Sequence, residues 1–160
     1  MIVEISSTNL RSFRTTQTLS MVKGKGDELP ENTFQVENIK DLDLLHSVAI
    51  YGANASGKSN LLRAVRSMKR IVTESSQRGI SLPLVPFKFN KDNLHKPTEF
   101  EIVFIVNKVR YQYGFSATEE QIFDEWLFAY PRGRAQKWFE RVWDAKDKKH
   151  LWHFGSSFVG

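Results

Sequence analysis

The sequence predicts an α/β fold in which a phosphate-binding loop core is joined to an antiparallel β-meander subdomain. Residues 52–59, GANASGKS, lie between a short apolar run and an amphipathic helical pattern, which is the strand–loop–helix context of a phosphate-binding loop. From residue 99 onward, apolar residues recur at every second position, as in half-buried strands. We expect residues 1–80 to form the loop core and residues 81–160 the antiparallel subdomain, together as one incomplete domain.

Composition and charge are those of a soluble globular chain with a basic surface. A chain of 160 residues is long enough for one domain with a hydrophobic core. Its residues are 41% hydrophobic and 26% charged, as is usual for a globular protein. No run approaches the roughly 18 apolar residues that span a bilayer, so we expect no membrane partner. Cysteine is absent, which excludes disulfides and thiolate metal sites and fits a cytoplasmic protein. The net charge of +5 makes DNA a partner to consider.

The first half of the chain reads as strands separated by a polar loop. Residues 1–9 and 15–22 are β-prone and predict two strands. Residues 24–38 are polar and contain Gly, Pro and Asn, which predicts a loop. Residues 47–51, SVAIY, form an apolar run that suits a buried central strand leading into the glycine-rich loop.

An amphipathic helix is predicted directly after the glycine-rich loop. Apolar residues at spacings of four, three and four share one helix face: Leu61, Val65, Met68 and Val72. Basic residues lie mostly off this face. Gly79, followed by Pro83 and Pro86, is expected to end the helical region.

The second half of the chain predicts an antiparallel meander. Alternating apolar residues in 99–106, 111–115, 122–130 and 136–143 predict four strands. Asn107-Lys108 is a plausible tight turn, because Asn tolerates positive φ. The aromatic residues gather on one face of this meander, and we expect them to form core in preference to a base-stacking platform.

The glycine-rich stretch carries the clearest chemistry, because it matches G-x-x-x-x-G-K-[ST] in full. Gly52 and Gly57 allow the backbone to approach a phosphate closely, and the amides of the loop can turn inward around it. The Lys58 ammonium is expected to reach the β- and γ-phosphates as the catalytic cation, and the Ser59 hydroxyl to hold Mg²⁺. The predicted nucleotide-binding residues of this Walker A loop are Gly52, Ala53, Asn54, Ala55, Ser56, Gly57, Lys58 and Ser59.

The stretch YGANASGKSNLLRAV, which contains Asn54 and Asn60, resembles the corresponding loop of ATPases of the ATP-binding-cassette type. It is most similar to their chromosome-structure and DNA-repair branch, and to the bacterial AAA-family ATP-binding proteins associated with phage defence. Residues 9–13, NLRSF, resemble the first-strand motif of that branch, whose Arg and Ser lie close to the nucleotide. The resemblance therefore adds Arg11, Ser12 and Asn60 to the expected binding residues, and it covers about the first half of the chain.

The resemblance implies that ATP and Mg²⁺ are the cofactors and that hydrolysis occurs between dimerised ATPase heads in a full-length parent. An effector or nuclease would be a further partner. Such ATPases also need an apolar strand ending in Asp-Glu and a signature segment, and neither is evident after Lys58. The pair Asp124-Glu125 lies within the predicted meander and is not expected to be catalytic. His150 and His153 could share a helix face but lack a third metal ligand. We therefore expect an N-terminal ATPase lobe, or a truncated copy of one.

Three readings of the function stay open at this point. The first is an ATPase lobe, and the second is a nucleotide-binding module that does not hydrolyse ATP. The third is a DNA-contacting nucleotide sensor, for which the alternative explanation is a solvated, charged sheet edge. The basic cluster behind this third reading comprises Arg132, Arg134, Lys137, Arg141, Lys146, Lys148 and Lys149. A GTPase is disfavoured, because the guanine-reading Asn-Lys-x-Asp motif is absent from the sequence.

Overall fold

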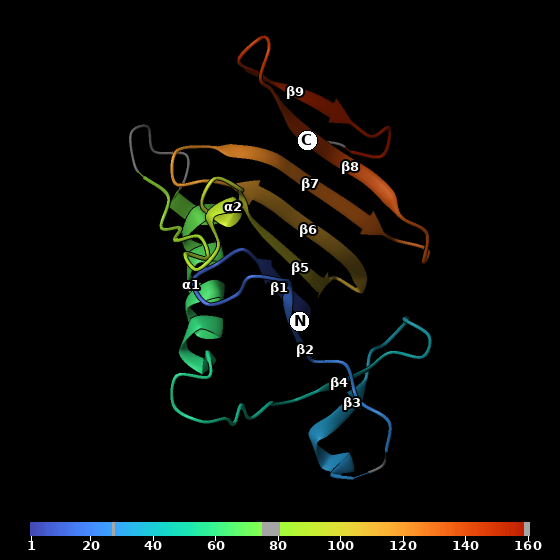
Figure 1. Ribbon diagram of the computed structural model, residues 1–160. Helices are drawn as coiled ribbons and strands as arrows, with labels where there is room; N and C mark the ends of the chain where they lie inside the picture. Colours follow the sequence, from blue (N-terminus) through green and yellow to red (C-terminus); the bar gives the residue numbers. More distant parts are fainter. Residues whose placement is uncertain (27, 75–80, 159–160) are drawn as a thin grey trace.

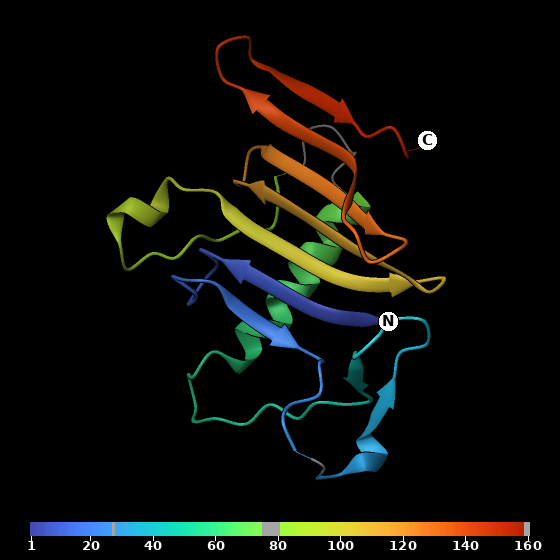
Figure 2. The same ribbon diagram turned by 90° about the vertical axis from the view of Figure 1, so that its right-hand side faces the viewer.

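A seven-stranded antiparallel sheet dominates the computed structural model, which describes residues 1–26, 28–74 and 81–158. The strands lie side by side in the order β2-β1-β5-β6-β7-β8-β9, so the first two strands join the edge of the later meander (Figures 1 and 2). Their bounds are β1 Ile2–Thr8, β2 Gln17–Ser20, β5 Thr98–Val106, β6 Val109–Ala117, β7 Ile122–Tyr130, β8 Gln136–Asp144 and β9 Lys149–Phe154.

One long helix and one small hairpin complete the fold. Helix α1, Lys58–Glu74, lies against one face of the sheet, where Figure 2 shows it behind the strands. Strands β3, Thr33–Gln35, and β4, Asp43–Leu45, pair with each other below the sheet in Figure 1. Two single-turn helices, η1 at Pro30–Asn32 and α2 at Lys91–Leu94, lie in the connections.

A hydrophobic cluster covers each face of the sheet, and a bulge in β1 lets this strand contribute side chains to both clusters. Ile5 packs with Met68 and Ile71 of α1 over the paired rings of Phe100 and Phe115, whose centroids are 5.2 Å apart. The pairing of β1 with β5 shifts register between Ile2 and Glu4. A bulge turns one side chain to the opposite face, and Val3 accordingly packs in a second cluster with Val36, Leu44 and Ile105. This second cluster attaches the β3–β4 hairpin to the sheet.

The predicted meander is confirmed. Its strands could be predicted because alternating apolar residues indicate both a strand and the face that it buries. β5, β6, β7 and β8 cover the four predicted segments. Asn107 and Lys108 form the expected turn with φ values of 49° and 64°. On the face of α1, aromatic rings run from β5 to β9. Phe100 and Phe115 are buried beneath the helix, whereas Trp152 and Phe154 at the far edge are 48% and 61% exposed.

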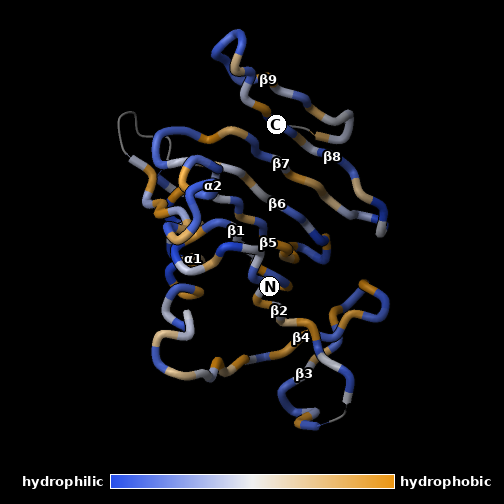
Figure 3. Tube along the Cα trace, in the orientation of Figure 1, coloured by the Kyte–Doolittle hydropathy of each residue, from blue (hydrophilic) through white to orange (hydrophobic). Residues whose placement is uncertain are grey.

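The prediction of a buried central strand at residues 47–51 is wrong. This segment has no regular strand in the structure, and Val48, Ile50 and Tyr51 are 41%, 40% and 89% exposed. Figure 3 shows its apolar stretch running from β4 to α1 outside the sheet. A central strand needs neighbours on both sides, and among the described residues every strand pair is antiparallel and excludes this segment. The described chain thus presents the antiparallel sheet without a parallel core.

Smaller corrections concern three other segments. Residues 24–38, expected to be loop, contain η1 and β3, because the hairpin packs on the sheet. Residues 149–154 form β9, so His150 and His153 point to opposite faces of a strand and share no helix face. Helix α1 is described as far as Glu74, and Gly79 lies outside the described residues.

The predicted apolar face of α1 is rotated by part of a turn from the buried one. The residues of α1 that are buried are Ala64, Ser67, Met68 and Ile71. Val72 is 51% exposed and, with Val65, borders an apolar groove of about 610 Å³ between α1 and the sheet. The spacing of apolar residues predicts the helix correctly, but the packing of the helix on the sheet decides which of its residues are buried.

Replacing Gly114 with alanine is expected to destabilise the protein by about 1–3 kcal/mol through overpacking. The ring of Trp126 lies over Gly114, and an added Cβ would overlap that ring and lie 2.8 Å from the carbonyl oxygen of Phe100. Urea unfolding of G114A measures this loss. Gly24→Ala is the control, because nothing lies within 4 Å of its added Cβ. Equal stability of the two variants would contradict the close packing at Gly114.

Candidate functional site

The glycine-rich loop makes a tight turn that leads directly into α1. Ala55 and Gly57 adopt positive φ values of 64° and 99°. The amide of Ser56 donates to the carbonyl of Ala53 at 3.2 Å, and the amides of Asn60 and Leu61 both donate to the carbonyl of Gly57, at 2.8 and 3.1 Å. Gly57 therefore receives the first hydrogen bonds of the helix, which begins at Lys58 as the sequence predicts.

Both motif glycines are required by the packing around the loop. A Cβ on Gly52 would lie 2.7 Å from the hydroxyl oxygen of Ser56. A Cβ on Gly57 would lie 3.3 Å from the ring of Phe13 and 3.5 Å from the hydroxyl oxygen of Ser12, and its φ disfavours any side chain. The loop is thus held close both to itself and to the turn after β1.

Lys58 lies across the loop. Its ammonium nitrogen donates to the carbonyl oxygens of Gly52 at 2.7 Å and Ala53 at 2.8 Å. An ammonium has three donors, so the third remains for an acceptor outside these two bonds. The two carbonyls hold the positive charge of Lys58 at the mouth of the loop.

The backbone amides at the start of α1 complete an anion-binding cradle. In the described part of the chain, the amides of Gly57, Lys58 and Ser59 have no acceptor. The first amides of a helix lack partners within it, and together with the helix dipole they favour an anion. The hydroxyl of Ser59 is exposed beside them. The residues present therefore fit a bound phosphate group.

The turn after β1 approaches this cradle through Ser12 and Phe13. The amide nitrogen of the Asn60 side chain donates to the hydroxyl oxygen of Ser12 at 2.8 Å, and Arg63 donates to the Asn60 side-chain oxygen at 3.1 Å. Phe13 lies against Gly57, as described above. The structure thus brings together the loop, Ser12 and Asn60, which sequence similarity alone had grouped.

Arg11 is placed in this turn by its backbone. Its amide donates to the carbonyl of Val85 at 2.7 Å, and its φ is 52°. Its side-chain Nε is buried without a hydrogen-bond partner among the described residues. This guanidinium nitrogen is therefore a donor that a ligand could satisfy.

Asn9 holds the turn after β1 in place through its side chain, a role that the sequence analysis did not predict. Its side-chain nitrogen donates to the carbonyls of Asn93 and Lys96, both at 2.9 Å, and of Pro97 at 3.3 Å. Its side-chain oxygen accepts from the amide of Phe87 and the side chain of Asn93, both at 3.1 Å. Asn9 is buried and has a φ of 54°. The tolerance of Asn for this backbone region is the one clue that the residue type carries.

The acidic pair in β7 is engaged in the sheet and does not serve the loop. Asp124 accepts from the hydroxyl of Ser116 at 2.7 Å. Glu125 accepts from the hydroxyl of Tyr113 at 2.6 Å and forms an ion pair of 2.7 Å with Arg141. Burial and the Glu125 hydrogen bond raise the pKa of the Tyr113 phenol, which keeps it a proton donor. In the described residues, no three His, Asp or Glu side chains gather as a metal site.

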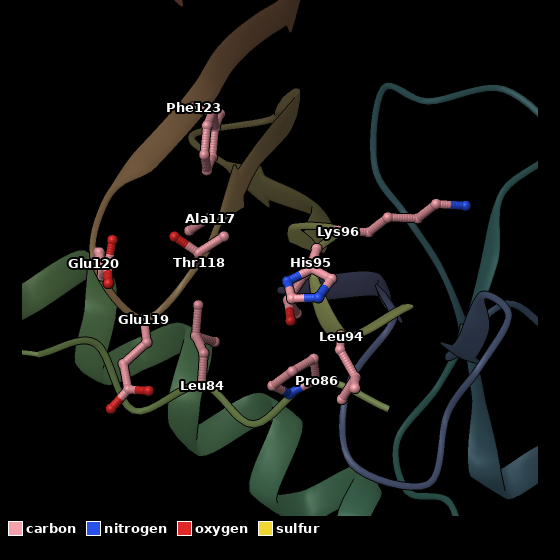
Figure 4. Close-up of a pocket in the computed structure, with 11 residues that line it drawn as sticks. Leu84, Pro86, Leu94, His95, Lys96, Ala117, Thr118, Glu119, Glu120 and Phe123 are labelled. Carbon is pink, nitrogen blue, oxygen red and sulfur yellow. The ribbon is translucent and has the colours of Figure 1, made fainter. Parts of the chain in front are cut away.

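A polar pocket of about 320 Å³ lies beside α2, where Figure 4 shows the His95 ring and the Glu119 and Glu120 carboxylates around its mouth. Glu119 accepts from the hydroxyl of Ser81 at 2.8 Å. The residues that line this pocket come from outside the glycine-rich loop. Two carboxylates at its mouth make it a poor place for a phosphate, so the cradle at α1 is the stronger candidate.

Residues 47–158 match the family model described as "AAA domain, putative AbiEii toxin, Type IV TA system". The match begins before the glycine-rich loop and spans well over half of the chain. The chain belongs to this AAA domain family. Membership supports a P-loop ATPase type of domain and nucleotide binding. No curated protein matches the chain. In the described residues, no helix has the length and apolar character that would let it cross a membrane.

Proposed function

We propose that this AAA domain binds ATP and Mg²⁺ through residues 52–59. The observation that carries the proposal is the cradle at the start of α1, where the amides of Gly57, Lys58 and Ser59 lack acceptors among the described residues. The ammonium group of Lys58 lies at the same loop, where it donates to the carbonyls of Gly52 and Ala53. Together they supply dipoles and one full positive charge to a triphosphate.

The binding residues act by positioning and by charge neutralisation. The loop amides hold the phosphate oxygens, and the third donor of Lys58 reaches toward the β- and γ-phosphates. Mg²⁺ would neutralise phosphate charge, with the Ser59 hydroxyl as its protein ligand. The hydrogen bond from Asn60 to Ser12 holds the turn after β1 against the start of α1, beside the loop. The unpartnered Arg11 Nε provides a further donor for the nucleotide.

Hydrolysis is proposed for a full-length parent in which two ATPase heads of the ATP-binding-cassette type dimerise. The resemblance of the loop and of residues 9–13 supports this assignment, as it does a cytoplasmic role in phage defence with an effector or nuclease partner. The observation that favours a binding module for these 160 residues is the engagement of Asp124 and Glu125 within the sheet. A water-activating carboxylate must be able to reach the γ-phosphate.

Ser59→Ala is expected to remove the dependence of ATP affinity on Mg²⁺, because the variant lacks the hydroxyl ligand. Titration of the purified protein with a fluorescent ATP analogue, with and without Mg²⁺, measures this dependence. Thr73→Ala, at the far end of α1, is the matched control and should behave as the unchanged protein. Failure of the unchanged protein to bind millimolar ATP would contradict the proposed function. Phosphate release above the level of Lys58→Ala would show that these residues hydrolyse ATP without a further segment.

A further inference from the structure

A basic cleft lies at the end of the sheet opposite the glycine-rich loop. β1 starts beside it, where the Ile105 amide donates to the carbonyl of Met1 at 2.8 Å, and ends at the turn that contacts Gly57. The seven residues of β1 at about 3.3 Å per residue separate the two ends by roughly 20 Å. The cleft has a volume of about 420 Å³ and is lined by Asn38, Ile39, Lys40, Lys108, Arg110, Tyr130, Pro131, Arg132 and Gly133.

Three segments that are distant in sequence bring four cations to this cleft. Lys40 comes from the connection between β3 and β4, Lys108 and Arg110 from the β5–β6 hairpin, and Arg132 from the β7–β8 turn. Among the described residues that line the cleft, none is acidic. Four like charges that line one cleft indicate a site for an anion.

A neighbouring carboxylate, Glu37, offsets part of this charge. Glu37 forms an ion pair of 2.8 Å with Lys108, in which the side chains are 78% and 63% exposed. The hydrogen bond and charge of Lys108 lower the pKa of Glu37, so this carboxylate stays ionised at neutral pH. An exposed pair of this kind is weak, and a phosphate can compete for Lys108. Lys40, Arg110 and Arg132 remain outside the pair.

Arg110 is held over an aromatic ring that lines the same cleft. Its guanidinium carbon lies 4.0 Å from the centroid of the Tyr130 ring, and the hydroxyl of Tyr130 donates to the side-chain oxygen of Gln112 at 2.7 Å. A guanidinium whose carbon lies over a ring can keep its N–H groups for an outside acceptor. Two parallel N–H donors match the geometry of a phosphate.

We propose that this cleft binds the phosphodiester backbone of nucleic acid. The cations are spread over three segments and alternate with Ile39, Tyr130 and Pro131, a mixture that suits a polymer of phosphates and sugars better than a single small ion. The site lies apart from the glycine-rich loop, so the proposal does not rest on nucleotide binding there.

Three of the seven cations in the cluster behind the DNA reading form ion pairs in the structure. Arg141 pairs with Glu125 at 2.7 Å, Lys137 with Glu140 at 2.7 Å, and Lys149 with Asp147 at 2.9 Å. Arg132 is the member of that cluster that lines the cleft. The proposed surface therefore differs from the cluster that the sequence analysis considered, and a nucleic-acid partner stays a prediction.

A charge-reversal experiment tests the cleft. Lys40→Glu with Arg132→Glu changes two exposed residues of the cleft, and Lys146→Glu with Lys148→Glu makes the same change in net charge at the β8–β9 turn. A fluorescent 20-base-pair DNA duplex is titrated with each 160-residue protein at several salt concentrations. For the cleft variant we expect an affinity at least about tenfold weaker and a salt slope reduced by about two. The control should stay within about threefold of the unchanged protein.

Several results would overturn the proposal. They are no duplex binding at 50 mM salt by the unchanged protein, an equal loss in both variants, or a loss in the control alone. Displacement of the duplex by 10 mM inorganic phosphate at constant ionic strength would assign the cleft to a small anion. Arg132→Gln, a milder change, is expected to weaken binding about threefold and guards against misfolding of the double variant. Binding of ATP by the cleft variant is expected to be unchanged, which separates this test from that of the proposed function.

Discussion

Lys58→Ala is expected to weaken ATP binding by about 2–3 kcal/mol, equivalent to roughly 30–150-fold in Kd, because it removes a charge-assisted donor to the phosphates. The ammonium is already positioned by the carbonyls of Gly52 and Ala53, at 2.7 and 2.8 Å. Little side-chain freedom is therefore lost when a nucleotide binds, and the full interaction appears in the affinity. Calorimetric titration with ATP and Mg²⁺ measures the change.

Two comparisons separate the charge of Lys58 from its placement. Lys58→Arg keeps the charge, but its planar fork cannot reproduce the two contacts of a compact ammonium with the loop carbonyls, so we expect a loss close to that of alanine. Lys69→Ala removes an exposed cation further along the same helix and should bind ATP normally. An equal loss in Lys58→Ala and Lys69→Ala would mean that only the general charge of α1 matters, against the proposed role of Lys58.

Local patterns in the sequence were sufficient for the meander and for the start of α1. Alternation places one side chain in two on each face, so β5 to β8 follow from the apolar residues alone. The turn at Asn107-Lys108 follows from the tolerance of Asn for positive φ, and it has that conformation. The position of the glycine-rich loop before the helix follows from its motif.

The remaining features depend on contacts that no local pattern reports. Residues 47–51 have the composition of a buried strand, but burial requires neighbouring strands, and the described residues provide none for them. The bulge that turns Val3 away from Ile5 depends on the pairing with β5. The grouping of Arg110 with Lys40 depends on the packing of the β3–β4 hairpin, which brings residues about 70 positions apart in the numbering to one cleft. Sequence reasoning therefore identified the loop but neither the basic cleft nor the role of Asn9.

Asn9→Ala is expected to destabilise the protein by about 3 kcal/mol, because it leaves buried polar groups without partners. The Asn9 side chain donates to three carbonyls in residues 93–97 and accepts from the amide of Phe87 and the side chain of Asn93. Its own carbonyl accepts from the hydroxyl of Thr98 at 2.8 Å. Loss of the side chain should also loosen the turn that carries Ser12 to Asn60, and so weaken ATP binding several-fold below the unfolding transition.

The contribution of the hydrogen bonds can be separated from that of the backbone conformation. Asn38 has a φ of 64°, close to the 54° of Asn9, but is exposed, so Asn38→Ala reports mainly the backbone strain of about 1 kcal/mol. Asn9→Gly relieves that strain and still removes the side chain, so it should remain about 2 kcal/mol less stable than the unchanged protein. Urea unfolding of the three variants measures these differences. If Asn9→Ala lost no more stability than Asn38→Ala, the Asn9 hydrogen bonds would contribute nothing net. The turn beside the glycine-rich loop would then be held by Phe13 and the Ser12–Asn60 contact instead.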